Sequence, residues 1–245
     1  MINKIFPLVK DKLNGNIVQP LLSYTPEEYR LEMANKILSL VKDKLDSNMV
    51  STILIYTPGK HNFEMINKIL PLVKDKLDFD IVNTFIRYTG GRKTPKEHRL
   101  EIINKILPLV KNKLDGDMVG ILLSSTPEER KLEMINKILS LVKDKLDSNM
   151  VSAILTYTPK EYRLEMINKI LPLVKDKLDS NMVSTLMWNI RYAPEEDKLE
   201  IINKILPLVK DKLDFNMADF LLSYTPEEYR LEMINKIFPL VKDKF

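Results

Sequence analysis

Hydrophobic positions recur along the chain with a spacing that predicts two kinds of helix. Between Glu128 and Leu146, apolar residues return every three or four positions, which places them on one face of a helix. Charged and small polar residues fill the opposite face, so we predict a long amphipathic helix of about twenty residues with one buried side. A second apolar run, from Met150 to Leu155, predicts a short helix of about nine residues after a tight turn.

The long and short helices repeat along the whole chain. The stretch Met134–Leu146 (MINKILSLVKDKL) recurs in eight similar copies, which begin at Met1, Met33, Met65, Ile102, Met134, Met166, Ile201 and Met233. The copies are 32 residues apart, except for two intervals of 37 and 35 residues. A fixed period of this size is typical of a stacked helical array. Because neither helix can bury its apolar face alone, we expect neighbouring copies to supply the other wall.

This period predicts the fold class and the domain organisation. We predict an all-α fold, a right-handed α-solenoid of about seven 32-residue helix-pair repeats plus a terminal helix. The chain is expected to form a single repeat domain over residues 1–245. Its repeats are predicted to span residues 1–32, 33–64, 65–101, 102–133, 134–165, 166–200, 201–232 and 233–245.

Residues near the helix ends predict how each helix begins. Thr126-Pro127 ahead of two glutamates predicts an N-cap for the long helix, and Asn149 predicts an N-cap for the short one. A proline stands inside the long helix in six copies, at Pro7, Pro71, Pro108, Pro172, Pro207 and Pro239, while the other two copies carry Ser39 and Ser140. Since this position lies on the polar side, we predict one kinked helix and not two helices.

Two polar features recur along the long helices, the first in every copy and the second in all complete copies but the fourth. An asparagine such as Asn136 lies at the edge of the apolar face, and we expect its amide to bond a backbone group of the neighbouring repeat. A ladder of asparagines that reads a ligand is the alternative. The Lys-Asp-Lys run at the end of the helix is predicted to be a solvated end that the helix dipole favours.

Composition narrows the function classes. The chain has 38 basic and 34 acidic residues, and its net charge of +4 is too small to indicate nucleic-acid binding by itself. It has no cysteine, hence no disulfide or thiolate chemistry. No apolar run approaches the ~20 residues of a membrane span, and no signal-peptide pattern precedes the first copy. The compartment is not fixed by these features, and the expectation is a soluble intracellular protein.

The sequence offers little for catalysis or metal binding. His61 and His98 occupy equivalent positions in adjacent repeats, so we expect them about 10 Å apart, too far to share a metal ion, on the surface. Asp147-x-Asn149 lacks the glycine and the final glutamate of a calcium loop. Two histidines and no cysteine leave no set of nucleophile, base and orienting group. We therefore predict that the protein is not an enzyme and uses no metal or cofactor.

The copies differ most in the loop after the short helix. The third copy has five extra residues in this loop and the sixth has three, near Trp188. Insertions in repeat arrays lie on one face, often the binding face, although neutral drift in exposed loops is the alternative. The candidate binding residues are Tyr56, Lys60, His61, Tyr88, Arg92, Lys93, His98, Trp188, Arg191 and Tyr192. Trp188, the only tryptophan, is the best single candidate for a contact anchor.

One segment resembles a known family. Leu164–Val174 (LEMINKILPLV) resembles the second helix of the repeats of transcription-activator-like effectors, which bind DNA and place Leu-Glu ahead of a Leu-Pro-aliphatic step. The resemblance implies a base-reading loop at Tyr157-Thr158 and its equivalents. This chain has Pro159 there, and often two glutamates, which would repel phosphates. The segment is also similar to the second helix of degenerate ankyrin repeats, without the Thr-Pro-Leu-His motif of that family.

These features together favour a binding protein. We expect a non-enzymatic scaffold that recognises a protein or peptide through the variable loop face. The alternative is a nucleic-acid-binding repeat protein related to the effector repeats, for which binding would weaken steeply with salt. A further alternative is a designed or purely structural array.

Overall fold

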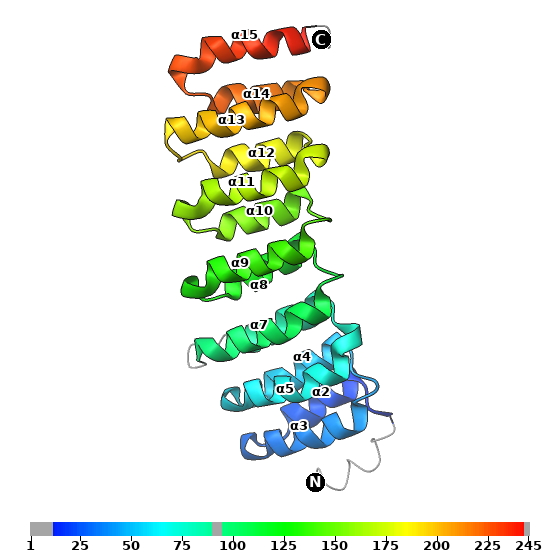
Figure 1. The fold of residues 1–245 in the computed structure, drawn as a ribbon. Helices are drawn as coiled ribbons and strands as arrows, with labels where there is room; N and C mark the ends of the chain where they lie inside the picture. The colour runs from blue at the N-terminus through cyan, green and yellow to red at the C-terminus, as the bar shows by residue number, and fades with distance from the viewer. Residues whose placement is uncertain (1–11, 90–94, 243–245) are drawn as a thin grey trace. The chain divides into compact units, whose positions relative to one another are not determined.

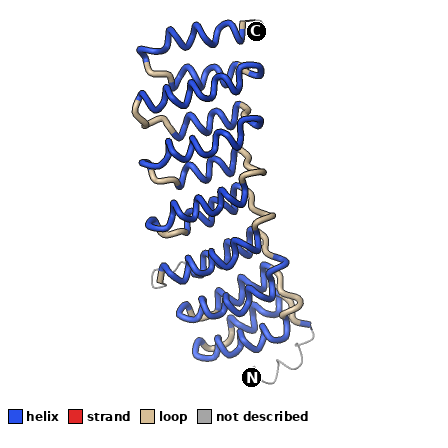
Figure 2. Tube along the Cα trace, in the orientation of Figure 1, coloured by secondary structure: helices blue, strands red, loops and turns tan. Residues whose placement is uncertain are grey.

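The computed structural model describes residues 12–89 and 95–242. Within these ranges the regular structure consists of fourteen α-helices, α2 to α15, and six short 3-10 helices, with no strand (Figure 2). The predicted all-α fold is therefore confirmed. The first predicted long helix falls on residues 1–11, outside the described residues.

Contacts between Cα atoms divide the chain into two compact units. Unit 1 runs to Leu114 and includes Ser125–Pro127, whereas unit 2 contains Asp115–Ser124 and the chain from Glu128 onward. The helices of unit 1 are α2 (Gly15–Ser23), α3 (Glu27–Val41), α4 (Ser47–Tyr56), α5 (Asn62–Val73), α6 (Phe79–Thr89) and α7 (Lys96–Val110). Those of unit 2 are α8 (Gly116–Ser125), α9 (Glu128–Val142), α10 (Ser148–Tyr157), α11 (Arg163–Val174), α12 (Ser180–Asn189), α13 (Glu195–Val209), α14 (Phe215–Tyr224) and α15 (Arg230–Val241).

The same packing pattern occurs in each unit. In unit 1 the short helices α2, α4 and α6 pack on one another in series, and the long helices α3 and α5 pack on α4. In unit 2 the short helices α10, α12 and α14 form an equivalent series (Figure 1). Helices α4 and α12 therefore each have a short helix on either side, and α4 also has the long helices α3 and α5 against it. The predicted single domain and the predicted repeat count stay predictions.

The buried residues follow the predicted helical spacing. In α9 the buried side chains are Met134, Ile135, Ile138, Leu139 and Val142, and in α10 they are Met150, Val151, Ile154 and Leu155. The four residues of α10 are those expected to face inward. Burial of these aliphatic side chains stabilises each unit by about 1.5–3 kcal/mol per residue, before the loss of conformational entropy is subtracted.

The long helices are shorter than the predicted twenty residues. Helix α9 has 15 residues and ends at Val142, and α5 has 12 and is followed by a 3-10 turn at Lys74–Lys76. The reason lies in the next leucine. The backbone of Leu77 is not helical, with φ of −56° and ψ of 117°, and its side chain is buried in the core, so the α-helix stops before it.

The short helices are capped two residues earlier than predicted. Asp46 accepts a hydrogen bond from the Met49 amide at 2.8 Å, and Asp147 does the same for Met150, also at 2.8 Å. Both aspartates have extended backbones, as an N-cap requires, whereas Asn149 already lies inside α10. The predicted cap at Asn149 and its equivalents is therefore wrong.

The predicted threonine caps of the long helices are also wrong. The Thr57 hydroxyl donates to the Ile53 carbonyl at 2.7 Å, and Thr158 donates to Ile154 at 2.8 Å. Both threonines are buried at the end of the preceding short helix. They close that helix, and the next long helix begins after a proline without a side-chain cap in α3, α7 and α13.

The long helices continue through their prolines, as predicted. Pro71, Pro108 and Pro172 all lie inside α5, α7 and α11, within three residues of the end. Where serine replaces proline, the hydroxyl bonds the helix itself, as in the 2.7 Å bond from Ser39 to the Lys36 carbonyl. The predicted kink stays a prediction.

The repeated asparagine uses its amide differently from the prediction. The Asn67 Nδ2 donates to the Phe63 carbonyl of its own helix at 3.1 Å, and its Oδ1 accepts from Lys105 Nζ of the next repeat at 2.7 Å. Lys68 and Asn35 repeat the second contact at 3.0 Å. The contact between repeats thus runs through a lysine and not through a backbone group.

The Lys-Asp-Lys runs also connect repeats. Lys76 donates to the carbonyls of Asp43 and Leu45, at 3.2 and 3.3 Å, at the end of the preceding long helix. In unit 2, Lys177 reaches Asp144 and Leu146 in the same way. The prediction of a solvated helix end is therefore incomplete. The lysine donates to carbonyl groups of the preceding repeat that the long helix of that repeat leaves without a partner.

Candidate functional site

The sixth loop, between α12 and α13, departs most from the other described loops of unit 2. Here Ile190 occupies the place of the buried threonine, and Pro194 directly precedes the next long helix, α13. Ile190 is buried, and its amide bonds the Met187 carbonyl at 3.1 Å. The three inserted residues are therefore 191–193, directly after the buried end of α12.

Arg191 joins two exposed aromatic side chains. Its guanidinium carbon lies 4.0 Å from the centre of the Trp188 ring and 4.6 Å from that of Tyr192. Its Nη1 also donates to the Trp188 carbonyl at 2.9 Å. Trp188 is 57% exposed and Tyr192 80% exposed, so the aromatic surface is presented to solvent. We call these three residues the Trp188 cluster.

Positive charge changes the ionisation of Tyr192. Arg191 lowers the pKa of the Tyr192 phenol from its ordinary value, first through a hydrogen bond and then through its charge. Lys160, in the 3-10 turn Lys160–Tyr162 of the preceding loop, lowers the pKa of the same phenol further. The positive charge of Lys160 in the preceding loop therefore acts on the phenol of Tyr192 in the Trp188 cluster.

The predicted residues of unit 1 do not form one comparable cluster. Lys60 is exposed in the 3-10 turn Gly59–His61, and His61 Nδ1 lies 3.8 Å from a Glu64 carboxylate oxygen. His98 stacks on Phe63, with ring centres 3.9 Å apart and planes at 10°. Each histidine thus has a partner within the protein, Glu64 for His61 and Phe63 for His98, and both histidines are half-buried.

Two further candidates, Tyr56 and Tyr88, lie at or near the ends of short helices. Tyr56 is half-buried, and the Arg30 guanidinium lies 5.7 Å from its ring centre. Lys131 stands 5.6 Å from the Tyr157 ring in the same way in unit 2. Tyr88 is half-buried near the end of α6. The remaining two candidates, Arg92 and Lys93, lie outside the described residues.

Sequence reasoning singled out all three members of the Trp188 cluster but missed what surrounds it. Nothing in the pattern indicated that Arg191 would lie between the two rings, because this depends on the turn after α12. Lys160 was missed as well, although its place in the equivalent loop of the preceding repeat was a signal that could have found it.

Residues 12–89 and 95–242 contain no group of three or more histidines and carboxylates that could hold a metal ion. In that part of the chain, no helix has the length and apolarity needed to cross a membrane.

Comparison with known proteins gives no family. A scan against known protein families finds no match to this chain, and a search of curated proteins finds no similar protein.

Proposed function

We propose that this chain is a non-enzymatic scaffold that binds a protein or peptide through its loop face. The observation that carries the proposal is the Trp188 cluster, in which two exposed aromatic rings are held by one arginine. Tryptophan, tyrosine and arginine are the residues that most often dominate binding energy at protein interfaces. Here Trp188 comes from the last turn of α12, and Arg191 and Tyr192 come from a loop that is three residues longer than in most copies.

The contacts of Arg191 favour a rigid anchor. Cation–π contact at an exposed site stabilises such an arrangement by about 0.5–1 kcal/mol for each ring. Because the guanidinium also bonds the Trp188 carbonyl, the indole position is tied to the end of α12. A side chain that is already ordered loses less entropy on binding, so it contributes more to affinity.

We also propose that the helix pairs form a right-handed α-solenoid. The support is the series of short helices within each unit and the period of the sequence. An open stack of this kind places equivalent loops side by side along one edge, where a partner can contact several of them.

A selection from a displayed peptide library on the full-length protein tests the function. We expect enriched peptides to bind the wild type, and Trp188→Ala to weaken that binding at least about tenfold. The matched control is Tyr24→Ala, because Tyr24 is 85% exposed in the first loop but has no part in the cluster. It should leave the affinity unchanged. The proposal is wrong if no peptide is enriched, or if the Trp188→Ala and Tyr192→Ala variants bind the enriched peptides as tightly as the wild type does.

The nucleic-acid alternative is tested by fluorescence anisotropy with labelled single- and double-stranded DNA. Binding through phosphates should weaken by orders of magnitude between 50 and 200 mM salt. If the protein binds peptides, we expect no binding to either DNA at low salt. DNA binding whose affinity falls steeply with salt would instead support the nucleic-acid alternative.

A further inference from the structure

Lys160 reverses the charge that unit 2 carries elsewhere at the start of its long helices. The residue after the loop proline is an exposed glutamate in three loops of this unit, at Glu128, Glu195 and Glu227, whereas it is Lys160 in the loop between α10 and α11. A carboxylate at this place interacts favourably with the positive end of the helix dipole, and a lysine does not. Lys160 therefore gives up a local stabilisation, as residues of binding sites often do.

A second departure from the repeat pattern adds positive charge beside the first. Arg191 is one of the three residues inserted in the next loop, between α12 and α13. Arg191 and Lys160 both lower the pKa of the Tyr192 phenol, so their charges act at the same place. Two adjacent loops thus differ from their equivalents in ways that make one exposed aromatic surface positive.

These two cations have no carboxylate partner in the described part of the chain. The lysines inside the long helices are neutralised locally, as in the 2.7 Å ion pair between Lys169 and Glu165. Within residues 12–89 and 95–242, neither Lys160 nor Arg191 forms such a pair. Arg191 donates from Nη1 to the Trp188 carbonyl, and a guanidinium has further N–H groups to offer. The positive charge is therefore available to a negatively charged group of a partner.

The following loop has the opposite charge. Glu228 raises the pKa of the Tyr229 phenol, first through a hydrogen bond and then through its charge, and Glu196 and Glu232 raise it further. No carboxylate is among the groups that act on Tyr192. A negatively charged group is therefore attracted to the Trp188 cluster and repelled one loop further on.

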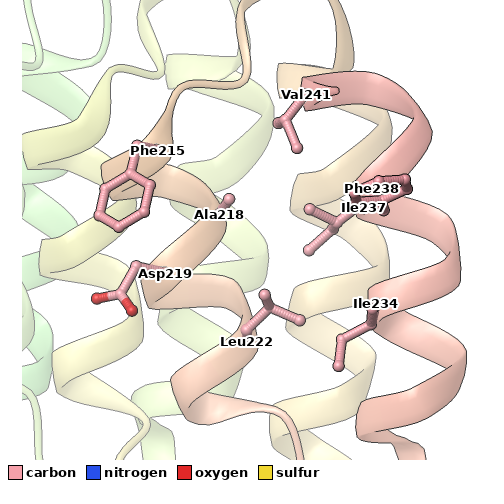
Figure 3. Close-up of a pocket in the computed structure, with 8 residues that line it drawn as sticks. All are labelled: Phe215, Ala218, Asp219, Leu222, Ile234, Ile237, Phe238 and Val241. Atoms are coloured by element: carbon pink, nitrogen blue, oxygen red, sulfur yellow. The ribbon is translucent and has the colours of Figure 1, made fainter. Parts of the chain in front are cut away.

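A second apolar surface of unit 2 is also unsuited to a negatively charged group. It is a groove of about 360 Å³ between α14 and α15 (Figure 3). Its lining includes Phe215 and Phe238, and Asp219 is the only charged residue among the lining residues. Because Asp219 would repel a carboxylate, an acidic segment favours the Trp188 cluster over this groove.

We propose that the Trp188 cluster and Lys160 together bind an acidic side chain of the partner peptide. The carboxylate accepts hydrogen bonds from Arg191 and is attracted by Lys160, while a neighbouring apolar side chain packs against the exposed rings. This inference rests on the proposed function, because it names the chemistry of the peptide that the same site binds. The expected peptide has an aspartate or glutamate next to an apolar residue.

The fluorescence of Trp188 follows this binding directly, because Trp188 is the only tryptophan in the chain. The probes are tryptophan-free peptides selected on the full chain from a displayed random library. Each is also synthesised with its acidic residues replaced by asparagine or glutamine. We expect the selected peptides to share an acidic residue and to change the Trp188 emission. Their amide versions should bind at least about tenfold more weakly.

Lys160→Glu tests the contribution of the preceding loop. The variant carries the glutamate that three equivalent positions of unit 2 have, so we expect it to fold. It should weaken the binding of the acidic peptides at least about tenfold and affect their amide versions less. Circular dichroism verifies that the variant remains helical.

The matched control is the double variant Lys160→Glu with Glu227→Lys. It has the net charge of the wild type but carries the lysine two loops further on, and Glu227 is not among the groups that act on Tyr192. We expect the double variant to bind the acidic peptides as weakly as Lys160→Glu does. Wild-type affinity in the double variant would show that net charge alone attracts the peptides, and this overturns the inference.

The remaining outcomes separate this inference from the proposed function. If the selected peptides change the Trp188 emission but lack an acidic residue, or if their amide versions bind as tightly, the function stands and the acidic preference is wrong. Acidic peptides that bind without changing the emission would place their site elsewhere and also overturn the inference. If no peptide is enriched, the proposed function fails and this inference fails with it.

Discussion

Asn67 shows how one polar side chain can connect two repeats. It donates to a carbonyl of its own helix and accepts from Lys105 of the next long helix, 2.7 Å away. Lys105 also pairs with Glu101 at 2.6 Å. The lysine therefore bridges two repeats while its charge is balanced within its own helix. Because the pair is exposed, its contribution is small for each repeat and becomes important only through repetition.

A double-mutant cycle measures this contact. We expect Asn67→Ala to lower the free energy of unfolding by about 0.5–1 kcal/mol, because it removes one part-buried and one exposed hydrogen bond. Lys105→Ala should have an effect of similar size, and the double variant should lose less than the sum. Urea unfolding of the four proteins gives the coupling energy. Strict additivity would mean that the contact between repeats contributes nothing.

The pKa of Tyr192 reports the arrangement of the Trp188 cluster. Arg191 lowers the pKa of this phenol below its usual value of about 10. A lowered pKa favours the phenolate in the folded state. Its stabilising effect is therefore present above the unfolded pKa, is lost as the pH falls through the folded pKa, and is absent at neutral pH.

NMR titration of tyrosine labelled with ¹³C at Cζ checks this effect. Tyr192 should titrate below the usual tyrosine pKa of about 10, and Arg191→Gln should raise the pKa of Tyr192 toward that value. Tyr192→Phe assigns the resonance. An unchanged pKa in Arg191→Gln would show that the guanidinium does not lie against the phenol in solution.

At the scale of the helix, the turn between long and short helices depends on one aspartate. Asp46 and Asp147 each accept from an amide in the first turn of the following short helix. The asparagine two residues later lies inside that helix and has no capping role. The same sequence, Asp-Ser-Asn, thus contains a capping residue and a helical residue that are both good N-caps by type.

The matched substitutions Asp46→Ala and Asn48→Ala distinguish the capping residue from the residue inside the helix. We expect Asp46→Ala to destabilise the protein by about 1 kcal/mol, because an amide of the first turn loses its acceptor. Asn48→Ala should change the free energy of unfolding by less than about 0.5 kcal/mol, as an exposed substitution usually does. Urea or thermal unfolding measures both, and the opposite order would restore the cap predicted from the sequence.

The prolines inside the long helices provide a second comparison. Pro71 lies inside α5, while the equivalent positions in α3 and α9 are Ser39 and Ser140. Since proline removes one backbone hydrogen bond, Pro71→Ser should stabilise the protein by about 1 kcal/mol or more. Ser140→Pro should destabilise it by a similar amount. If chemical denaturation shows no change in either variant, the helix end has already relaxed around the proline.

The elements could be predicted from the sequence more completely than their ends. The spacing of Met150, Val151, Ile154 and Leu155 is enough to define the inner face of α10, because burial follows helical periodicity. The prediction of the N-caps failed because Asp147 and Asn149 are chemically similar, and only the backbone conformation shows which of them caps the helix. The site was predicted in part: Trp188 stood out by residue type, but the position of Arg191 between the rings of Trp188 and Tyr192 depends on the turn after α12.

At the scale of the whole molecule, the proposed solenoid is an open stack in which each repeat is stabilised by its neighbours. Within each unit, contacts between successive short helices and lysine bonds between successive repeats support this arrangement. A stack of about seven layers, each about 10 Å thick, would be roughly 70 Å long. The radius of gyration would then be about 24 Å, against about 18 Å for a compact chain of this length.

Small-angle X-ray scattering on the monomer peak of a size-exclusion column tests this claim most directly. The open stack predicts a radius of gyration near 24 Å and a pair-distance distribution with a long tail, as for a rod or an arc. A value near 18 Å with a symmetric distribution would contradict the stack.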